Sequence, residues 1–160
     1  MMHALFPIFL WFSQTGVGIF VQKYVWVFPA IEAIHIVALT VLFGAILFVD
    51  LQMLGLVKRD TSVAKLARDL GPWTFSSLIL ICLSGILLFS SEALKLYNSK
   101  PFQLKIAMLL TAIVYHFTVH RWVTNSNTGR IGPFWIRFTA IVSLSLWLGV
   151  GLAGRAIGFF

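Results

Sequence analysis

Charged residues are scarce in this chain, and that scarcity indicates its class. Of its 160 residues, 59% are hydrophobic and only 11% are Asp, Glu, Lys or Arg. So few charges cannot cover a soluble globule of this length, which excludes an ordinary soluble domain. No stretch rich in Pro, Gly and Ser divides the chain. We therefore predict one all-α integral membrane domain over residues 1–160.

The chain has only one cysteine and none of the common catalytic motifs. The one cysteine, Cys82, lies among Leu and Ile in an apolar run, so no disulfide framework and no CxxC motif is possible. We expect Cys82 to be a small buried apolar residue. The sequence contains no GxSxG, no P-loop and no HExxH motif, which argues against hydrolysis and phosphoryl transfer.

Acidic residues are few as well: five, against twelve Lys and Arg, for a net charge of +7. The basic residues stand singly or in pairs near the ends of apolar runs, as in the flanks of membrane spans. We therefore do not take the positive charge as a sign of nucleic-acid binding.

Four apolar runs dominate the rest of the sequence. At roughly 1.5 Å per helical residue, each can cross a hydrocarbon core of about 30 Å. Proline, which is favoured in the first turn of a helix, marks the start of the first three runs at Pro29, Pro72 and Pro101. The connections are short, so we predict an up-down bundle of four transmembrane helices. The spans are expected at residues 30–57, 73–91, 102–122 and 134–156.

Residues 1–28 precede these spans and do not resemble a signal peptide, because no Lys or Arg precedes their apolar run. That run, 4–12, is too short to cross a membrane and ends at a polar stretch, 13–16. Its aromatic residues predict an N-terminal helix lying in the membrane interface, and an extra span over 4–22 is the alternative. These aromatic residues are Phe6, Phe9, Trp11, Phe12, Tyr24 and Trp26.

The distribution of basic residues predicts the orientation. The first and third connections hold Lys58, Arg59, Lys65, Arg68, Arg121, Arg130 and Arg137, whereas the opposite side holds Lys23, Lys95, Lys100, Lys105 and Arg155. The larger group is expected on the cytoplasmic side, which places both termini outside the cytoplasm.

Small residues form two stripes in the spans. Ser77, Ser84 and Ser91 recur every seven residues with Gly85 beside them, and Gly151, Gly154 and Gly158 follow in the last span. Such stripes allow close approach of helices, so we interpret them as packing surfaces within the chain or between chains.

Ionisable residues inside the spans are the candidate site. Glu32 and Met53 share a helical face with His35, while His116 and His120 stand four residues apart on one side of the third span. Ionisable groups within a membrane are functional by default. The alternatives are a neutral His35 bonded to Glu32 or to a backbone carbonyl, an interhelical hydrogen bond at His116, and a solvated interfacial His120.

Asp50 and Arg155 are more simply explained as interfacial or snorkelling charges. His116 and His120 have a spacing that suits a metal ion, but a third nearby ligand is missing from the sequence pattern. His35 lies near the start of its span, and His120 lies near the end of a parallel one. Their depths then differ by on the order of 20 Å, which predicts two separate sites, one near each membrane face.

Several segments carry a family resemblance: PAIEAIH, VDLQMLGL, PFQLK and the late Gly154-Arg155. Together they resemble a family of small, uncharacterised bacterial membrane proteins with four spans. That family is similar in architecture to di-haem cytochrome b-type domains and, more loosely, to copper-resistance membrane domains. The resemblance implies a bacterial cytoplasmic membrane protein and a haem b role for His35 and His120.

Three functions remain open at this stage. The first is a b-type haem protein that transfers electrons across the membrane without being an enzyme itself; Arg155 and Arg121 would contact the haem propionates, and His116 would support His120. Each depth offers a histidine from one helix only, so a homodimer is expected to complete the ligand sets. The second is a copper, zinc or proton permease, and the third is an accessory subunit of a larger complex. The permease pathway would use Glu32, His35, Asp50, His116 and His120, with Met53 and Met108 as copper ligands.

Overall fold

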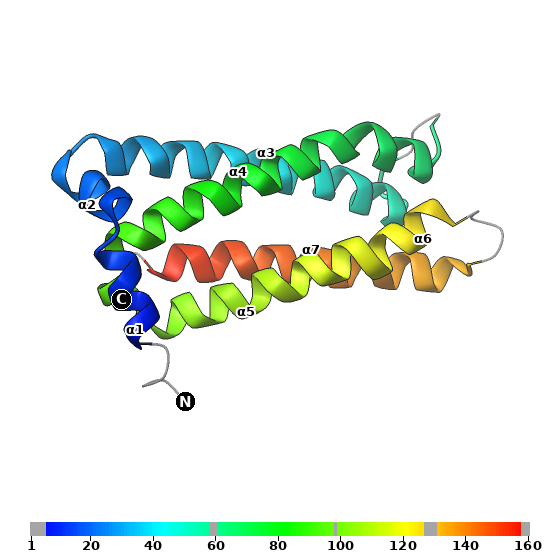
Figure 1. Ribbon diagram of the computed structural model, residues 1–160. Helices are drawn as coiled ribbons and strands as arrows, with labels where there is room; N and C mark the ends of the chain where they lie inside the picture. The colour runs from blue at the N-terminus through cyan, green and yellow to red at the C-terminus, as the bar shows by residue number, and fades with distance from the viewer. Residues whose placement is uncertain (1–5, 58–60, 98, 127–130, 158–160) are drawn as a thin grey trace. The chain divides into compact units, whose positions relative to one another are not determined.

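The computed structural model describes residues 6–57, 61–97, 99–126 and 131–157, and every regular element in these ranges is helical (Figure 1). Four helices are long and apolar enough to cross a membrane, which confirms the predicted fold class at that level. They are Val27–Leu54 (α3), Val63–Tyr97 (α4), the run Lys100–Asn125, and Pro133–Ala156 (α7). The third run consists of α5 (Lys100–Tyr115), η2 (His116–His120) and α6 (Arg121–Asn125).

The chain divides into two compact units that share the two longest helices. The first unit contains the residues up to Leu42 together with Phe75–Ser99, and the second contains Phe43–Thr74 with the residues from Lys100 onward. Each unit contains one part of α3 and one part of α4. They are described separately below.

In the first unit, the N-terminal segment forms two short helices, α1 (Phe6–Ser13) and α2 (Gly16–Lys23). Thr15 separates them: its hydroxyl donates to the carbonyl of Phe12 (2.7 Å) and accepts from the N–H of Gly18 (3.3 Å). This hydroxyl caps α2, as Thr commonly does at a helix start. The alternative of an extra span over 4–22 is therefore wrong, because neither eight-residue helix can cross a hydrocarbon core.

Aromatic side chains attach α1 to the C-terminal part of α4. Phe9 and Phe12 each pack edge to face on Phe89, with ring centroids 5.1 and 5.2 Å apart. Phe6 and Phe9 contact Tyr97 in the same way, at 5.4 and 5.3 Å. The aromatic residues that the sequence places in the interface therefore also hold the N-terminal segment against α4.

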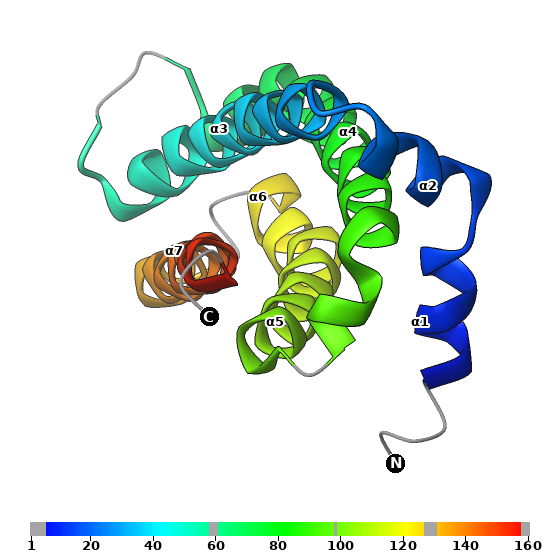
Figure 2. The same cartoon turned by 90° about the vertical axis from the view of Figure 1, so that its left-hand side faces the viewer.

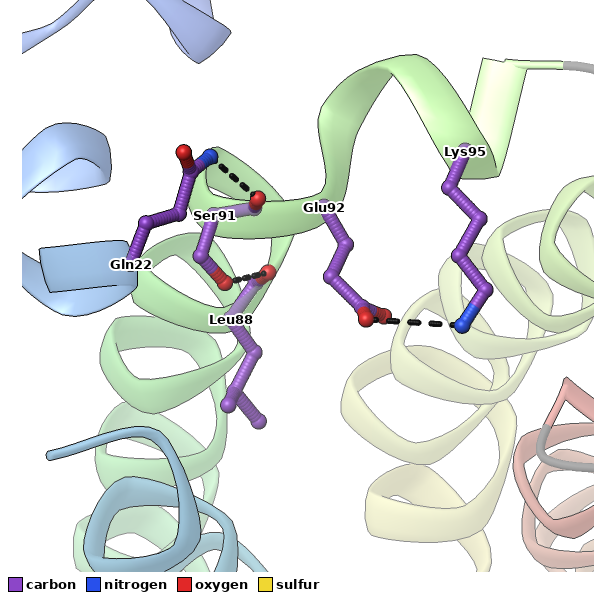
Figure 3. A network of polar contacts seen from close by, with 5 residues as sticks. All are labelled: Gln22, Leu88, Ser91, Glu92 and Lys95. Carbon is purple, nitrogen blue, oxygen red and sulfur yellow. Dashed lines mark hydrogen bonds and ion pairs between the residues drawn. The ribbon is translucent and has the colours of Figure 1, made fainter. Parts of the chain in front are cut away.

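Helix α4 bends where α2 meets it. Glu92 has non-helical dihedral angles, φ −120° and ψ 20°, which disturb the backbone hydrogen bonds of the preceding turn. Figure 3 shows the amide of Gln22 pointing at the carbonyl of Ser91, to which it donates at 2.6 Å. The backbones of α2 and α4 also approach closely, because a Cβ on Gly18 would stand 2.7 Å from the carbonyl oxygen of Ser90. The bend exposes a carbonyl, and α2 supplies its donor.

Helix α3 ends at a glycine in the left-handed conformation. Gly55 has φ 78°, its N–H donates to the carbonyl of Gln52, and the N–H of Leu56 donates to that of Leu51, both at 3.0 Å. These two bonds form a Schellman motif, in which glycine avoids the strain of a Cβ. The helix covers most of the predicted span 30–57 and stops three residues before its expected end.

Pro72 does not begin a helix, because α4 already starts at Val63 and passes through Pro72. Proline removes one N–H from the helix, so the carbonyl of Arg68 loses its usual partner. Arg68 and Pro72 both lie on the exposed side of the helix, where groups outside the protein can satisfy that carbonyl. The connection after α3 and the second span thus share one helix.

The core of the second unit is apolar and includes the early part of α4. Val49, Met53, Leu66, Val123 and Ala140 form its buried centre. Partly buried side chains from the same helices and from the start of the last span pack around it: Leu54, Val63, Ala67, Leu70, Ile131 and Ile136. Met53, expected as a supporting ligand, is therefore a core residue.

Helices α5 and α7 lie side by side and antiparallel in both views (Figures 1 and 2). A Cβ on Gly149 would overlap the methyl group of Met108, and one on Gly154 would stand 3.5 Å from the end of the Lys105 side chain. Gly151 has open space around it, so its predicted packing role within the chain is wrong. Gly158, the other member of the GxxxG pair, lies outside the described residues, as do Lys58, Arg59 and Arg130.

Cys82 also differs from expectation, because it is exposed rather than buried. It lies on the outward side of α4 beside the exposed Leu83 and Ile86, whereas Ser77 and Ser84 occupy the buried side. An apolar run does not reveal which of its residues face inward, since every position in it is hydrophobic.

Candidate functional site

A π-helical turn interrupts the third apolar helix at the two neighbouring histidines. His116–His120 forms η2 between α5 and α6, and the imidazole rings of these two residues stack at 4.9 Å between centroids with an interplanar angle of 22°. Isolated π turns inside α-helices are rare. Where they do occur, they often lie at functional sites. The turn therefore marks this segment of the second unit as a candidate site.

Asp50, from the second half of α3, pairs with His120. The ring nitrogen Nε2 of His120 lies 2.7 Å from Oδ1 of Asp50, so the imidazole N–H donates to the carboxylate. Exposure is 0% for the Asp50 side chain and 3% for that of His120. The interpretations of Asp50 as an interfacial charge and of His120 as a solvated histidine are therefore wrong. A buried carboxylate needs such a partner, because water does not solvate it.

Four buried polar atoms of the second unit have no hydrogen-bond partner among the described residues. They are Oδ2 of Asp50, Oε1 of Gln52, Nδ1 of His116 and Oγ of Ser143. Buried polar groups are usually satisfied, so such atoms indicate strain, a bound water or ion, or a functional role. Asp50 and His116 both belong to the group around His120, which thus retains the capacity for further hydrogen bonds.

Helix α7 closes the group from another side. Trp147 is buried and presents its ring edge-on to His116, with centroids 6.4 Å apart. One turn earlier on α7, Ser143 is buried on the same side. Tyr115, next to η2, donates its hydroxyl to the carbonyl of Thr139 at 3.2 Å and thereby joins α5 to α7. His116 thus has two aromatic neighbours, Trp147 on α7 and Phe117 in η2.

His35 belongs to the first unit and has a different environment. Its Nδ1 lies 2.8 Å from the hydroxyl of Ser84, and that hydroxyl has its one proton directed to the carbonyl of Leu80 at 2.6 Å. With that proton on the carbonyl, the hydroxyl oxygen accepts from His35, an arrangement that favours the Nδ1–H tautomer of the neutral imidazole. Gly85 lies against the ring, since a Cβ there would stand 3.5 Å from Cε1 of His35.

The serine stripe thus serves both packing and hydrogen bonding. Ser77, Ser84 and Ser91 are all buried, as a packing surface requires. Ser84 in addition orients His35, and the backbone carbonyl of Ser91 accepts from Gln22. Ser84 is a partner of His35 that the sequence reasoning did not consider beside Glu32 and the backbone carbonyls.

The remaining predicted site residues lie at the surface of the chain. Glu32, Arg121 and Arg155 are exposed. Asp50, His116 and His120 come together, yet no group of three His, Cys, Asp or Glu residues in the described ranges is arranged to hold a metal ion. Metal ligation by the histidine pair therefore stays a prediction without a third ligand.

Two residues that matter to these sites escaped the sequence reasoning. Trp147 was one aromatic residue among many, and Ser84 was taken only for packing. A signal for Ser84 existed, because a buried histidine requires a polar partner and the serine stripe offered one. No comparable signal distinguished Trp147 from the other tryptophans of the chain.

The comparisons assign a family and nothing more. A family of unknown function (DUF6644) matches residues 7–160, so the chain belongs to that family. No curated protein and no solved structure matches the chain. The predicted membership in an uncharacterised family is confirmed, and the likeness to di-haem cytochrome b-type domains stays a prediction.

Proposed function

We propose that this member of a family of unknown function is a multi-pass membrane protein that acts as a proton permease. Asp50 and His120 would form its proton-binding site. The observation that carries this proposal is the fully buried carboxylate at 2.7 Å from a buried imidazole, inside helices apolar enough to cross a membrane. Ionisable groups in that position commonly belong to proton relays.

The surface of the chain supports a membrane location. Large apolar side chains are exposed on all four long helices, for example Val37, Leu83, Leu110 and Leu152. Exposed apolar surface of this extent marks a membrane or protein interface. We place the protein in the bacterial cytoplasmic membrane with both termini outside the cytoplasm, as the basic residues and the family resemblance predict.

The pair can hold a proton in two ways. With one proton on Nε2, the pair is a neutral imidazole donating to a carboxylate. A further proton goes either to the carboxylate, which leaves both groups uncharged, or to Nδ1, which gives an imidazolium paired with the carboxylate. The charged forms are stable in an apolar core only while the two residues remain in contact, because a lone buried charge is costly. Oδ2 of Asp50 and Nδ1 of His116, which lack partners among the described residues, are the atoms through which protons would enter and leave.

Proton flux into vesicles tests this proposal. The purified protein is reconstituted in liposomes that contain a pH-sensitive dye, and a potassium diffusion potential drives proton entry. We expect Asp50→Asn to lower the flux at least tenfold, because an amide cannot take up the proton. Asp69→Asn is the matched control, since this exposed carboxylate lies in the same unit. Equal flux in empty and protein-containing vesicles, or in wild type and Asp50→Asn, would refute the proposal.

A second candidate function is haem b binding for electron transfer, and the environment of His35 favours it. Axial ligation uses a neutral imidazole, and the contact with Ser84 stabilises the neutral form of His35. Because Gly85 has no side chain, none lies against the His35 ring at that position. His120 pairs with Asp50 in the proposed proton site, so this candidate assigns the haem to His35 alone. A haem would supply one-electron chemistry, and a parallel homodimer would bring a second His35 to the same depth.

The absorption spectrum of the purified protein tests this second function. A haem protein shows a Soret band that His35→Ala abolishes, whereas His120→Ala retains it. The mass of the detergent complex, together with haem quantitation, then gives the number of chains per haem. A colourless wild-type protein purified from haem-supplemented cells would rule this candidate out and leave the permease proposal untouched.

A further inference from the structure

One end of the second unit carries positive charge without any acidic side chain. The start of α5 and the end of α7 meet there, as the contact between Lys105 and Gly154 shows. Lys100 opens α5, and Arg155 follows Gly154 near the end of α7. From residue 100 onward the sequence contains no Asp and no Glu. These two helices therefore cannot neutralise their cations with carboxylate side chains of their own.

Lys105 is the central residue of this end. Its side chain lies across Gly154, whose added Cβ would stand 3.5 Å from both Nζ and Cε. The residue is half-buried, and its Nζ makes no hydrogen bond and no ion pair with any residue in the described ranges. An ammonium group in an apolar helix pair is costly to keep without an anion. The missing glycine side chain lets the end of the Lys105 side chain lie against α7, so that Nζ stands beside the C-terminal end of that helix.

The position of Lys105 along the helix suits a lipid headgroup. It stands five residues after the first residue of α5, which is roughly 7.5 Å along the axis at about 1.5 Å per residue. A lysine at that depth extends its apolar stem toward the membrane surface and presents its charge among the headgroups. Basic pockets between transmembrane helices are known to bind anionic headgroups.

We propose that Lys105 and the neighbouring Arg155 bind the phosphate of an anionic phospholipid at the junction of α5 and α7. Arg155 is exposed and adds a planar donor group that suits phosphate. The site rests on the membrane location alone, and it is independent of proton transfer at Asp50.

Native mass spectrometry of the detergent-purified protein tests the site. We expect wild type to retain phosphatidylglycerol in preference to phosphatidylcholine, because only the former carries a net negative charge. Lys105→Gln should weaken that binding about tenfold or more, the change expected from losing one charge-assisted contact. Lys105→Arg should preserve it. Arg137→Gln is the matched control, since Arg137 is an exposed cation near the opposite end of α7.

The outcomes separate the possibilities. Equal retention of the two lipids by wild type, or unchanged binding in Lys105→Gln, would overturn the site. Displacement of the lipid by inorganic phosphate would assign the pocket to free phosphate and would also overturn the lipid assignment. If Lys105→Gln does not fold, Gly154→Val provides the second test, because its side chain would fill the space beside Nζ. Asp50→Asn should bind lipid like wild type even if it changes proton flux.

Discussion

At the residue scale, the pairing of Asp50 with His120 explains why a carboxylate can lie inside an apolar bundle of helices. The pair is held at 2.7 Å with both side chains nearly inaccessible. Such buried pairs add little net stability, because desolvation of the two groups offsets their attraction. Removing one partner, however, leaves the other unsolvated and unpaired. The two residues should therefore be strongly coupled in their effects on stability.

A double-mutant cycle measures this coupling. We expect Asp50→Leu or His120→Leu alone to lower the free energy of unfolding in detergent by about 3–5 kcal/mol. The double variant should lose less than the sum of the two, because neither polar group then remains buried alone. Additive losses would show that the two side chains do not depend on one another.

A second prediction concerns the hydroxyl that orients His35. Ser84→Ala leaves the Nδ1–H of His35 without this acceptor, so we expect a loss of about 1–3 kcal/mol in the free energy of unfolding. Ser77→Ala, at a buried serine of the same helix, is the control and should cost less. The ¹⁵N shifts of the imidazole provide a second measurement, since the Nδ1–H tautomer should dominate only while Ser84 is present. Equal stability of both variants would argue against this role.

At the scale of elements, helix α2 is attached to α4 by its backbone as well as by its side chains. Gly18 allows the approach to Ser90, and Gln22 donates to the carbonyl that the bend at Glu92 exposes. Both contacts occur on the same part of α4. The N-terminal segment is thus built into the first unit, beyond any affinity it has for the membrane interface.

Two glycines of α2 test this attachment. Gly18→Ala would place a Cβ 2.7 Å from the carbonyl oxygen of Ser90, so one of the helices must shift. We expect a loss of about 1–3 kcal/mol, typical of added volume at a tight contact. Gly16→Ala is the matched control, because nothing lies within 4 Å of its Cβ. The thermal unfolding of the two variants should differ clearly, and equal unfolding would mean that α2 does not pack on α4 as described.

At the scale of the whole molecule, orientation follows from the charges of the connections. Ser62 stands just before α4 in the connection that also holds Lys58 and Arg59, and Ser13 ends α1 near the N-terminus. The positive-inside rule places the first in the cytoplasm and the second outside.

Cysteine labelling in intact cells checks this orientation in a Cys82→Ser background. Ser13→Cys should react with a membrane-impermeant maleimide, whereas Ser62→Cys should react only after the membrane is opened. The natural Cys82 must be replaced because it is exposed. Efficient labelling of Ser62→Cys in sealed cells would reverse the proposed orientation.

The sequence by itself determined that the chain is helical and that four of its helices are long and apolar enough to cross a membrane. Composition and the length of apolar runs are local properties, and a membrane-sized helix needs nothing else to be recognised. The sequence also singled out His35, His116 and His120, because a polar residue in an apolar run stands out whatever surrounds it. The inward side of each run was not readable, so Cys82 and Gly151 were misjudged.

Only the tertiary structure decided which polar residues meet. Asp50 and His120 are 70 residues apart, and His35 and Ser84 are 49 apart. No local pattern relates such positions, since the pairing depends on which helices pack and at what rotation about their axes. The π turn depends on the same packing, because a helix of ordinary hydrophobic residues gives no sign of an extra residue in one turn. The chemistry of the site was therefore present in the sequence as separate residues, and the packing of helices made it a site.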